Sequence, residues 1–81
     1  MGMPKSLHSR EYDHFLSILR HFRENSGITQ EELAAKMGQT QTFVSKCERG
    51  ERRVDVVELR VFCKALKMPL QKFINAFESG L

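Results

Sequence analysis

Polar and basic residues recur at helical spacing in the segment QTFVSKCER, residues 41–49. If this segment is a helix, the pattern turns Val44, Cys47 and Glu48 toward the protein. The opposite face then carries Gln41, Thr42, Ser45, Lys46 and Arg49. Amide, hydroxyl and amino groups of this kind form hydrogen bonds with base edges and with phosphates. This face therefore has the chemistry of a DNA-contacting surface.

The start of this helix should supply most of the base contacts, because the N-terminal residues of a docked recognition helix reach the base edges. Gln41 and Thr42 occupy that start, and Lys46 lies one turn further along the same side. A glutamine amide pairs with adenine, and a lysine ammonium donates to guanine. We predict that Gln41, Thr42 and Lys46 contact bases. Phe43 beside them either packs against the protein or touches a thymine methyl group.

Phosphate contacts are expected on both flanks of this helix. Gln30 and Thr40 begin two consecutive helices, where free backbone N–H groups and the helix dipole attract anions. Further positive charge lies beyond the C-terminal end of the second of these helices. The predicted phosphate-contacting residues are Gln30, Thr40, Ser45, Arg49, Arg52 and Arg53. Such contacts set register and affinity rather than sequence preference.

Two short helices and a tight turn must hold these side chains in place. Ala34 supplies a small residue where the helices cross, and Gly38 can take the positive φ of the turn. Val44 then fills the angle between the helices. A turn of this type followed by a polar outward face is the layout of a helix-turn-helix, whose second helix enters the major groove.

Apolar residues at helical spacing predict three further helices around this pair. The expected caps or first residues of all five are Ser9, Thr29, Thr40, Asp55 and Pro69. We therefore predict an all-α fold, a compact five-helix bundle with the helix-turn-helix at its second and third helices. Residues 1–8 are expected to form a flexible tail and residues 9–81 a single DNA-binding domain.

Composition sets limits on the function. With 81 residues, the chain supports one small domain, and its net charge of +3 is too mild to indicate nucleic acid by itself. No apolar run is long enough for a membrane span. Cys47 and Cys63 lack a CxxC partner and are expected to be buried thiols in a cytoplasmic protein.

The sequence carries no set of residues that suggests catalysis. It shows no nucleophile beside a base, no paired carboxylates in an apolar pocket and no glycine-rich loop that would cradle a phosphate. His14 and His21 share a helix face but lack a third ligand, so no metal site is predicted. We expect no enzymatic activity, no cofactor and no small-molecule ligand.

The run GITQEELAAKMGQTQTFVSKCERGERR, residues 27–53, resembles the central pattern of the lambda-repressor-like, Cro-type helix-turn-helix family of phage and bacterial regulators, also called xenobiotic-response-element-like. The matching positions are Gln30, Glu32, Leu33, Ala34, Gly38, Val44, Ser45, Glu48 and Gly50. The resemblance extends over residues 12–77. One departure is Lys67, which stands where the family often has glycine.

This resemblance implies roles for several positions. Gln30 would bind a phosphate, and the base contacts would come from Gln41, Thr42 and Lys46. The resemblance also implies an ion pair between Arg23 and Glu48. The residues themselves indicate only that an inward-facing Glu48 needs a partner.

The last apolar stripe, within residues 70–77, either closes the core or leaves a surface for a second copy. We predict a homodimer, with Phe73, Phe77 and Leu81 as its possible interface. Such a dimer would bind a pseudo-palindromic operator and act as a transcriptional regulator, most simply a repressor that occupies a promoter. Two alternatives are an antitoxin, which would also hold a toxin, and a protein-interaction module without DNA affinity.

Overall fold

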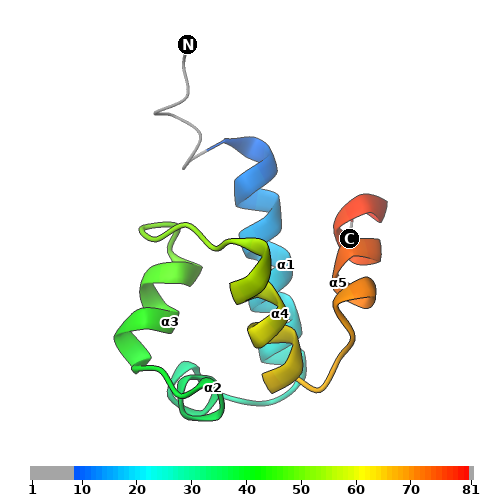
Figure 1. The fold of residues 1–81 in the computed structure, drawn as a ribbon. Helices are drawn as coiled ribbons and strands as arrows, with labels where there is room; N and C mark the ends of the chain where they lie inside the picture. Colours follow the sequence, from blue (N-terminus) through cyan, green and yellow to red (C-terminus); the bar gives the residue numbers. More distant parts are fainter. Residues whose placement is uncertain (1–8, 81) are drawn as a thin grey trace.

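The computed structural model describes residues 9–80, and these residues form five helices and no strand (Figure 1). The helices are α1 (Arg10–Asn25), α2 (Gln30–Met37), α3 (Gln41–Glu48), α4 (Val56–Ala65) and α5 (Leu70–Ser79). The prediction of an all-α five-helix fold is confirmed. The predicted tail, residues 1–8, and the predicted interface residue Leu81 lie outside the described residues.

Side chains fix where most of these helices begin. Ser9, Thr29, Thr40 and Asp55 each accept a hydrogen bond from a backbone N–H in the first turn of the helix that follows. The caps before α2 and α4 are reciprocal, because a glutamate of each helix bonds back to the N–H of its own cap. Pro69 is the N-cap of α5 rather than its first helical residue, and it provides no side-chain cap.

One apolar core joins all five helices. α2 packs against α3 and α4, while α5 packs against α1 and α4, and α1 also contacts α3. The side chains with no exposed surface come from every helix: Leu19, Leu33, Val44, Cys47, Phe62 and Phe73. No helix among the described residues is long and apolar enough to cross a membrane.

Phe73 belongs to this core, and its assignment to a dimer interface was wrong. Its ring lies 5.4 Å from that of Phe15 and 5.8 Å from that of Phe22, both on α1. The apolar stripe of α5 is thus covered by α1, and Phe73 has no surface left for a second copy. Phe77, one turn further on, is half-buried and stacks on His14, which is half-buried as well.

A residue with positive φ ends α2, and another follows α4. Gly38 takes φ 71° after α2, where its missing Cβ removes the steric penalty. Lys67 takes φ 58° after α4 and is the one non-glycine residue with positive φ in the described chain. At this position a lysine carries a backbone strain that the glycine of the family pattern would avoid.

Candidate nucleic-acid interface

The turn between α2 and α3 is held by the backbone as well as by packing. The N–H of Gln39 donates to the carbonyl oxygen of Ala34 at 2.9 Å, and Gly38 donates to Ala35 at 3.2 Å. Ala34 is 2% exposed and Val44 has no exposed surface. The two helices therefore sit in a fixed relation, which is what a helix must have before it can present side chains to a groove.

α3 separates its residues into an inner and an outer face. Val44, Cys47 and Glu48 are buried. Gln41, Thr42, Lys46 and Arg49 are exposed, and Ser45 is half-buried. The side chains predicted to contact bases thus lie together on one open side of α3.

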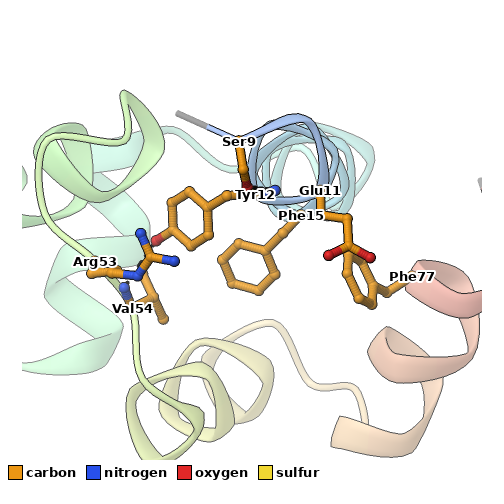
Figure 2. A pocket seen from close by; sticks show the side chains of 7 residues that line it. All are labelled: Ser9, Glu11, Tyr12, Phe15, Arg53, Val54 and Phe77. Carbon is orange, nitrogen blue, oxygen red and sulfur yellow. Dashed lines mark hydrogen bonds between the residues drawn. The ribbon is translucent and has the colours of Figure 1, made fainter. Parts of the chain in front are cut away.

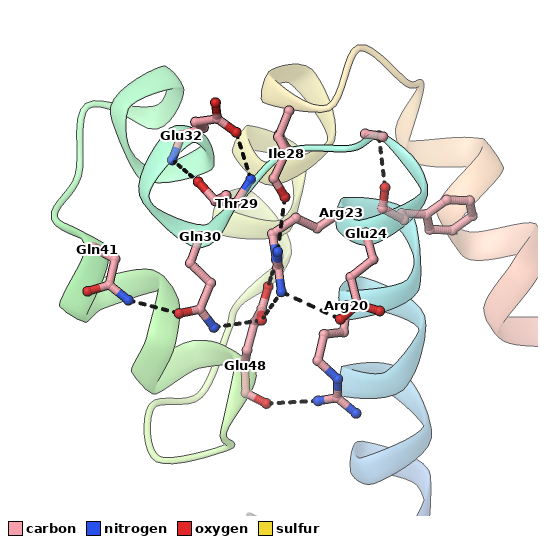
Figure 3. Close-up of polar contacts among 11 residues, drawn as sticks. Arg20, Arg23, Glu24, Ile28, Thr29, Gln30, Glu32, Gln41 and Glu48 are labelled. Atoms are coloured by element: carbon pink, nitrogen blue, oxygen red, sulfur yellow. Dashed lines mark hydrogen bonds and ion pairs between the residues drawn. The ribbon is translucent and has the colours of Figure 1, made fainter.

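A buried ion pair ties α1 to the C-terminal end of α3 (Figure 3). Arg23 Nε donates to Glu48 Oε2 at 2.6 Å, and Arg23 Nη2 donates to Glu48 Oε1 at 3.1 Å. Arg23 Nη1 also donates to the carbonyl oxygen of Ile28 at 3.0 Å. The Glu48 side chain is only 2% exposed. The hydrogen bonds to Glu48 hold the pKa of Arg23 above its usual value, although burial acts in the opposite direction.

Gln30 extends this network to the N-terminal end of α3, a link that no pattern of residues in the sequence indicated. Gln30 Nε2 donates to Glu48 Oε1 at 2.9 Å, and Gln30 Oε1 accepts from Gln41 Nε2 at 2.9 Å. Figure 3 shows the resulting line of side chains from Arg23 to Gln41. Gln41, a candidate for base contact, is thus linked to α1 through the side chains of Gln30 and Glu48.

The arginines that follow α3 are engaged within the protein. Arg49 Nε pairs with Glu51 Oε2 at 2.8 Å and also contacts the hydroxyl of Ser45. Arg52 Nη2 pairs with Glu58 Oε2 at 2.7 Å. These hydrogen bonds lower the pKa of Glu51 and of Glu58 and raise the pKa of both arginines. All four side chains lie near the surface, where solvent screens such pairs and leaves them weak.

Arg53 points elsewhere. Its guanidinium carbon lies 4.5 Å from the centroid of the Tyr12 ring. Figure 2 shows the two side chains in a hollow between α1, the α3–α4 loop and Phe77 at the end of α5. Tyr12 also accepts, through its hydroxyl oxygen, the N–H of Val54 at 3.0 Å. Of the arginines in the loop, Arg53 thus lies on the side that faces α1.

Phe43 packs against the protein, which is one of the two outcomes left open by the sequence. Its ring is half-buried and stacks on Phe62 of α4 with centroids 6.4 Å apart. The guanidinium carbon of Arg52 lies over the Phe43 ring, 4.7 Å from its centroid. Phe43 and Arg52 together connect α3 to the start of α4.

The two cysteines are buried free thiols, as predicted. Burial raises the pKa of Cys63 to about 11 and also raises that of Cys47. Because the thiolate is the reactive form, neither residue has the environment of a catalytic cysteine.

Known proteins resemble this chain in sequence and in fold. The helix-turn-helix domain family matches residues 15–72. The chain is 41% identical over 50 residues to an uncharacterized HTH-type transcriptional regulator, y4dJ, from Sinorhizobium fredii (strain NBRC 101917 / NGR234). That alignment covers 62% of this chain and 65% of the relative, so it spans just under two thirds of the relative's length.

Two solved structures share the fold. An XRE-family like protein from Pseudomonas syringae pv. tomato str. DC3000 aligns with a TM-score of 0.84 at 38% identity, over 98% of this chain and 96% of that one. A mutant of the restriction-modification controller protein C.Esp1396I aligns with a TM-score of 0.83 at 24% identity, over 89% of this chain and 96% of that one. The second likeness concerns the fold alone.

The family match covers more than half of the chain and includes the turn, both of its helices and most of the core. The family and the relative also indicate a protein without enzymatic activity. The chain belongs to the helix-turn-helix domain family and has the lambda-repressor-like fold of its XRE-type members.

Proposed function

We propose that the protein binds double-stranded DNA by placing α3 in the major groove, with Gln41, Thr42 and Lys46 on base edges. The observation that carries the proposal is the hydrogen bond from Gln41 Nε2 to Gln30 Oε1 at 2.9 Å. It uses one of the two N–H groups of the Gln41 amide. The other N–H and the amide oxygen remain as a donor and an acceptor side by side, which is the pair that adenine N7 and N6 require.

Phosphates would then be contacted from the flanks of α3. The N-termini of α2 and α3 provide Gln30 and Thr40, next to backbone N–H groups that attract anions. At the other end, Ser45 and Arg49 lie beside Lys46, and Arg49 would exchange Glu51 for a phosphate. Arg52 and Arg53 complete the proposed set, Arg53 being the side chain that would have to move furthest because it lies on Tyr12.

We also propose that the protein acts as a transcriptional regulator, as a homodimer on a pseudo-palindromic operator, and represses by occupying a promoter. The Sinorhizobium relative is named as an HTH-type transcriptional regulator, which supports the regulatory role. A domain with few base contacts gains useful affinity when two copies bind linked half-sites. An antitoxin role would require a toxin as an additional partner of the same chain.

The test begins with selection of bound fragments from a random DNA pool, followed by fluorescence anisotropy on the selected duplex and on scrambled DNA. Lys46→Ala should weaken binding to the selected duplex by about 1–3 kcal/mol and relax preference at one base position. Lys36→Ala is the matched control, because it also removes one lysine. Lys36 lies in the last turn of α2, beside Ser26 and Leu66, and not on α3. Equal losses on both duplexes for Lys46→Ala would contradict the base-reading role, and binding insensitive to salt would contradict DNA binding itself.

A further inference from the structure

A hollow lies where the start of α1, the α3–α4 loop and the end of α5 meet (Figure 2). Its volume is about 260 Å³, just below the range of pockets that hold drug-sized ligands. A space of this size suits a small planar molecule. The residues that line it come from three separate segments, so helical periodicity alone does not reveal it. The lining used below consists of Glu11, Tyr12, Phe15, Arg53, Val54 and Phe77.

The apolar surface of the hollow is mainly aromatic. The ring of Phe15 lies between two others, with its centroid 5.2 Å from that of Tyr12 and 6.4 Å from that of Phe77 (Figure 2). All three rings are only half-buried, so each keeps exposed surface. Aromatic rings attract one another in offset and edge-to-face arrangements with centroids about 4.5–7 Å apart. An aromatic ring is therefore the apolar group that this surface accepts best.

Two hydrogen-bond donors meet at one end of the hollow. The guanidinium carbon of Arg53 lies 4.5 Å from the centroid of the Tyr12 ring, and Figure 2 shows the guanidinium beside the Tyr12 hydroxyl. That hydroxyl accepts the N–H of Val54 at 3.0 Å, which leaves its own proton to donate. Within residues 9–80, Arg53 forms no ion pair. A guanidinium and a hydroxyl that donate at the same end of a pocket are the complement of a carboxylate.

Charge at the other end limits what a ligand can carry there. Glu11 lines the hollow on the far side of Phe15 from Arg53 (Figure 2). Glu11 is exposed, and no residue of the described chain forms an ion pair with it. The carboxylate of Glu11 repels a second anionic group but accepts a hydrogen bond from a hydroxyl. The hollow therefore favours an acid with a single charge and a neutral far end.

We propose that this hollow is a binding site for a small aromatic monocarboxylate. The carboxylate accepts hydrogen bonds from the Arg53 guanidinium and the Tyr12 hydroxyl, and the ring of the ligand lies on Phe15. The proposal departs from the expectation, drawn from the sequence, that the chain has no small-molecule ligand.

The bound ligand would also act as an effector. It holds Arg53 on Tyr12, the position that this arginine has to leave in order to reach a DNA phosphate. Occupation of the hollow should therefore weaken DNA binding by one phosphate contact. This effector role rests on the proposed function, whereas the binding of the ligand does not.

Binding is tested on the DNA-free protein by titration with 4-hydroxybenzoate, followed in ¹H–¹⁵N NMR spectra. The amide signal of Val54 should shift, because this N–H donates to the hydroxyl that the ligand engages. A ligand of about ten non-hydrogen atoms should reach a Kd of about 10 mM or tighter, even at the modest efficiency of drug-sized molecules. Phenol, which lacks the carboxylate, should bind at least about tenfold more weakly. Benzene-1,4-dicarboxylate should also bind more weakly, because its second carboxylate meets Glu11.

Three variants test the assignment of the two ends. Arg53→Gln should weaken the binding of 4-hydroxybenzoate at least about tenfold, because the charged donor is lost. Arg60→Gln is the matched control, since it removes an exposed arginine of α4 that does not line the hollow, and it should leave binding unchanged. Glu11→Gln should remove the difference between 4-hydroxybenzoate and the dicarboxylate. Thermal melts monitored by circular dichroism verify that each variant folds.

The effector role is tested by fluorescence anisotropy on the selected duplex, with and without saturating 4-hydroxybenzoate at constant ionic strength. Loss of one phosphate contact should make the slope of log K against log salt shallower by about 0.9. Arg53→Gln should show the shallower slope without ligand and should not respond further when the ligand is added.

Each outcome decides one part of the inference. A shift at Val54 that Arg53→Gln weakens and Arg60→Gln preserves supports the site. Absence of any shift up to about 10 mM, or equal binding of phenol, would overturn it. Binding of the ligand without a change in the salt slope would overturn the effector role. Failure of the ligand-free protein to bind any duplex would overturn the proposed function and the effector role, while the NMR titration would still decide the site.

Discussion

Removing the cation of the buried ion pair should destabilise the fold strongly. Arg23→Met keeps a long side chain but deletes the two hydrogen bonds to Glu48 and the one to the carbonyl oxygen of Ile28. The Glu48 carboxylate, 2% exposed, is then left with Gln30 as its remaining side-chain donor. Removing one partner of a buried pair costs about 3–5 kcal/mol.

That loss is a large part of the stability of a small domain, which is about 5–15 kcal/mol. It should lower the Tm by about 12 °C or more. Urea unfolding followed by circular dichroism measures the change in the free energy of unfolding. Arg20→Met is the matched control, because Arg20 lies one turn earlier on α1, is exposed and makes only a 3.4 Å contact with the Glu48 carbonyl oxygen.

The control should change stability by no more than about 0.5 kcal/mol. A second variant tests the cause of the loss. Arg23→Met combined with Glu48→Met removes both charges, so it should be more stable than Arg23→Met alone. If Arg23→Met and Arg20→Met unfolded at the same urea concentration, the stabilising role assigned to the pair would be refuted.

Three further predictions follow from single residues. Lys67→Gly should stabilise the protein by about 0.5–1 kcal/mol by relieving the positive φ, whereas Lys67→Ala, which keeps the Cβ, should give no gain in thermal unfolding. Cys47 and Cys63 should resist a thiol-disulfide reagent until the protein unfolds, because burial raises the pKa of both thiols; rapid labelling of the native protein would contradict this. Arg52→Gln should raise the pKa of Glu58, read from its carboxyl signal in an NMR titration, because the hydrogen bond from Arg52 is the main cause of the lowered value. The folded protein holds the pKa of Glu58 below its unfolded value. The stabilisation from Glu58 is therefore present above the unfolded pKa and is lost as the pH falls through the folded pKa. An unchanged titration of Glu58 in the Arg52→Gln variant would exclude Arg52 as the cause of the lowered pKa.

The parts of the fold that local chemistry determines were predictable from the sequence. The T-x-x-E box at Thr29 and the D-x-x-E box at Asp55 involve residues three apart, so the sequence alone places the helix starts. The turn at Gly38 follows from the residue that can take a positive φ. The outward face of α3 follows from helical periodicity once Val44 is turned inward.

Features that depend on packing between distant residues were harder to predict. Periodicity shows that one face of α5 is apolar, but it does not show which helix covers that face. For this reason the sequence left Phe73 open between the core and a possible interface, and the structure places it in the core. The charge of Arg52 was visible in the sequence, but its position over Phe43 depends on the path of the loop. The exposure of Val57 and Val61 did leave a signal, since both residues fall outside the apolar stripe of α4.

The position of Gln30 changes what its substitution should mean for DNA binding. A residue that contacts only phosphate would affect all sequences alike. Here Gln30 also orients Gln41, and it is itself held by Glu48. An apolar pair in place of Arg23 and Glu48 could pack as stably, but it would leave Gln30 without its acceptor and the Gln41 amide free to turn. The buried charges are thus better explained by the orientation of Gln41 than by stability alone. Gln30→Ala should accordingly weaken binding to every duplex and, in addition, reduce the discrimination at the base proposed to contact Gln41.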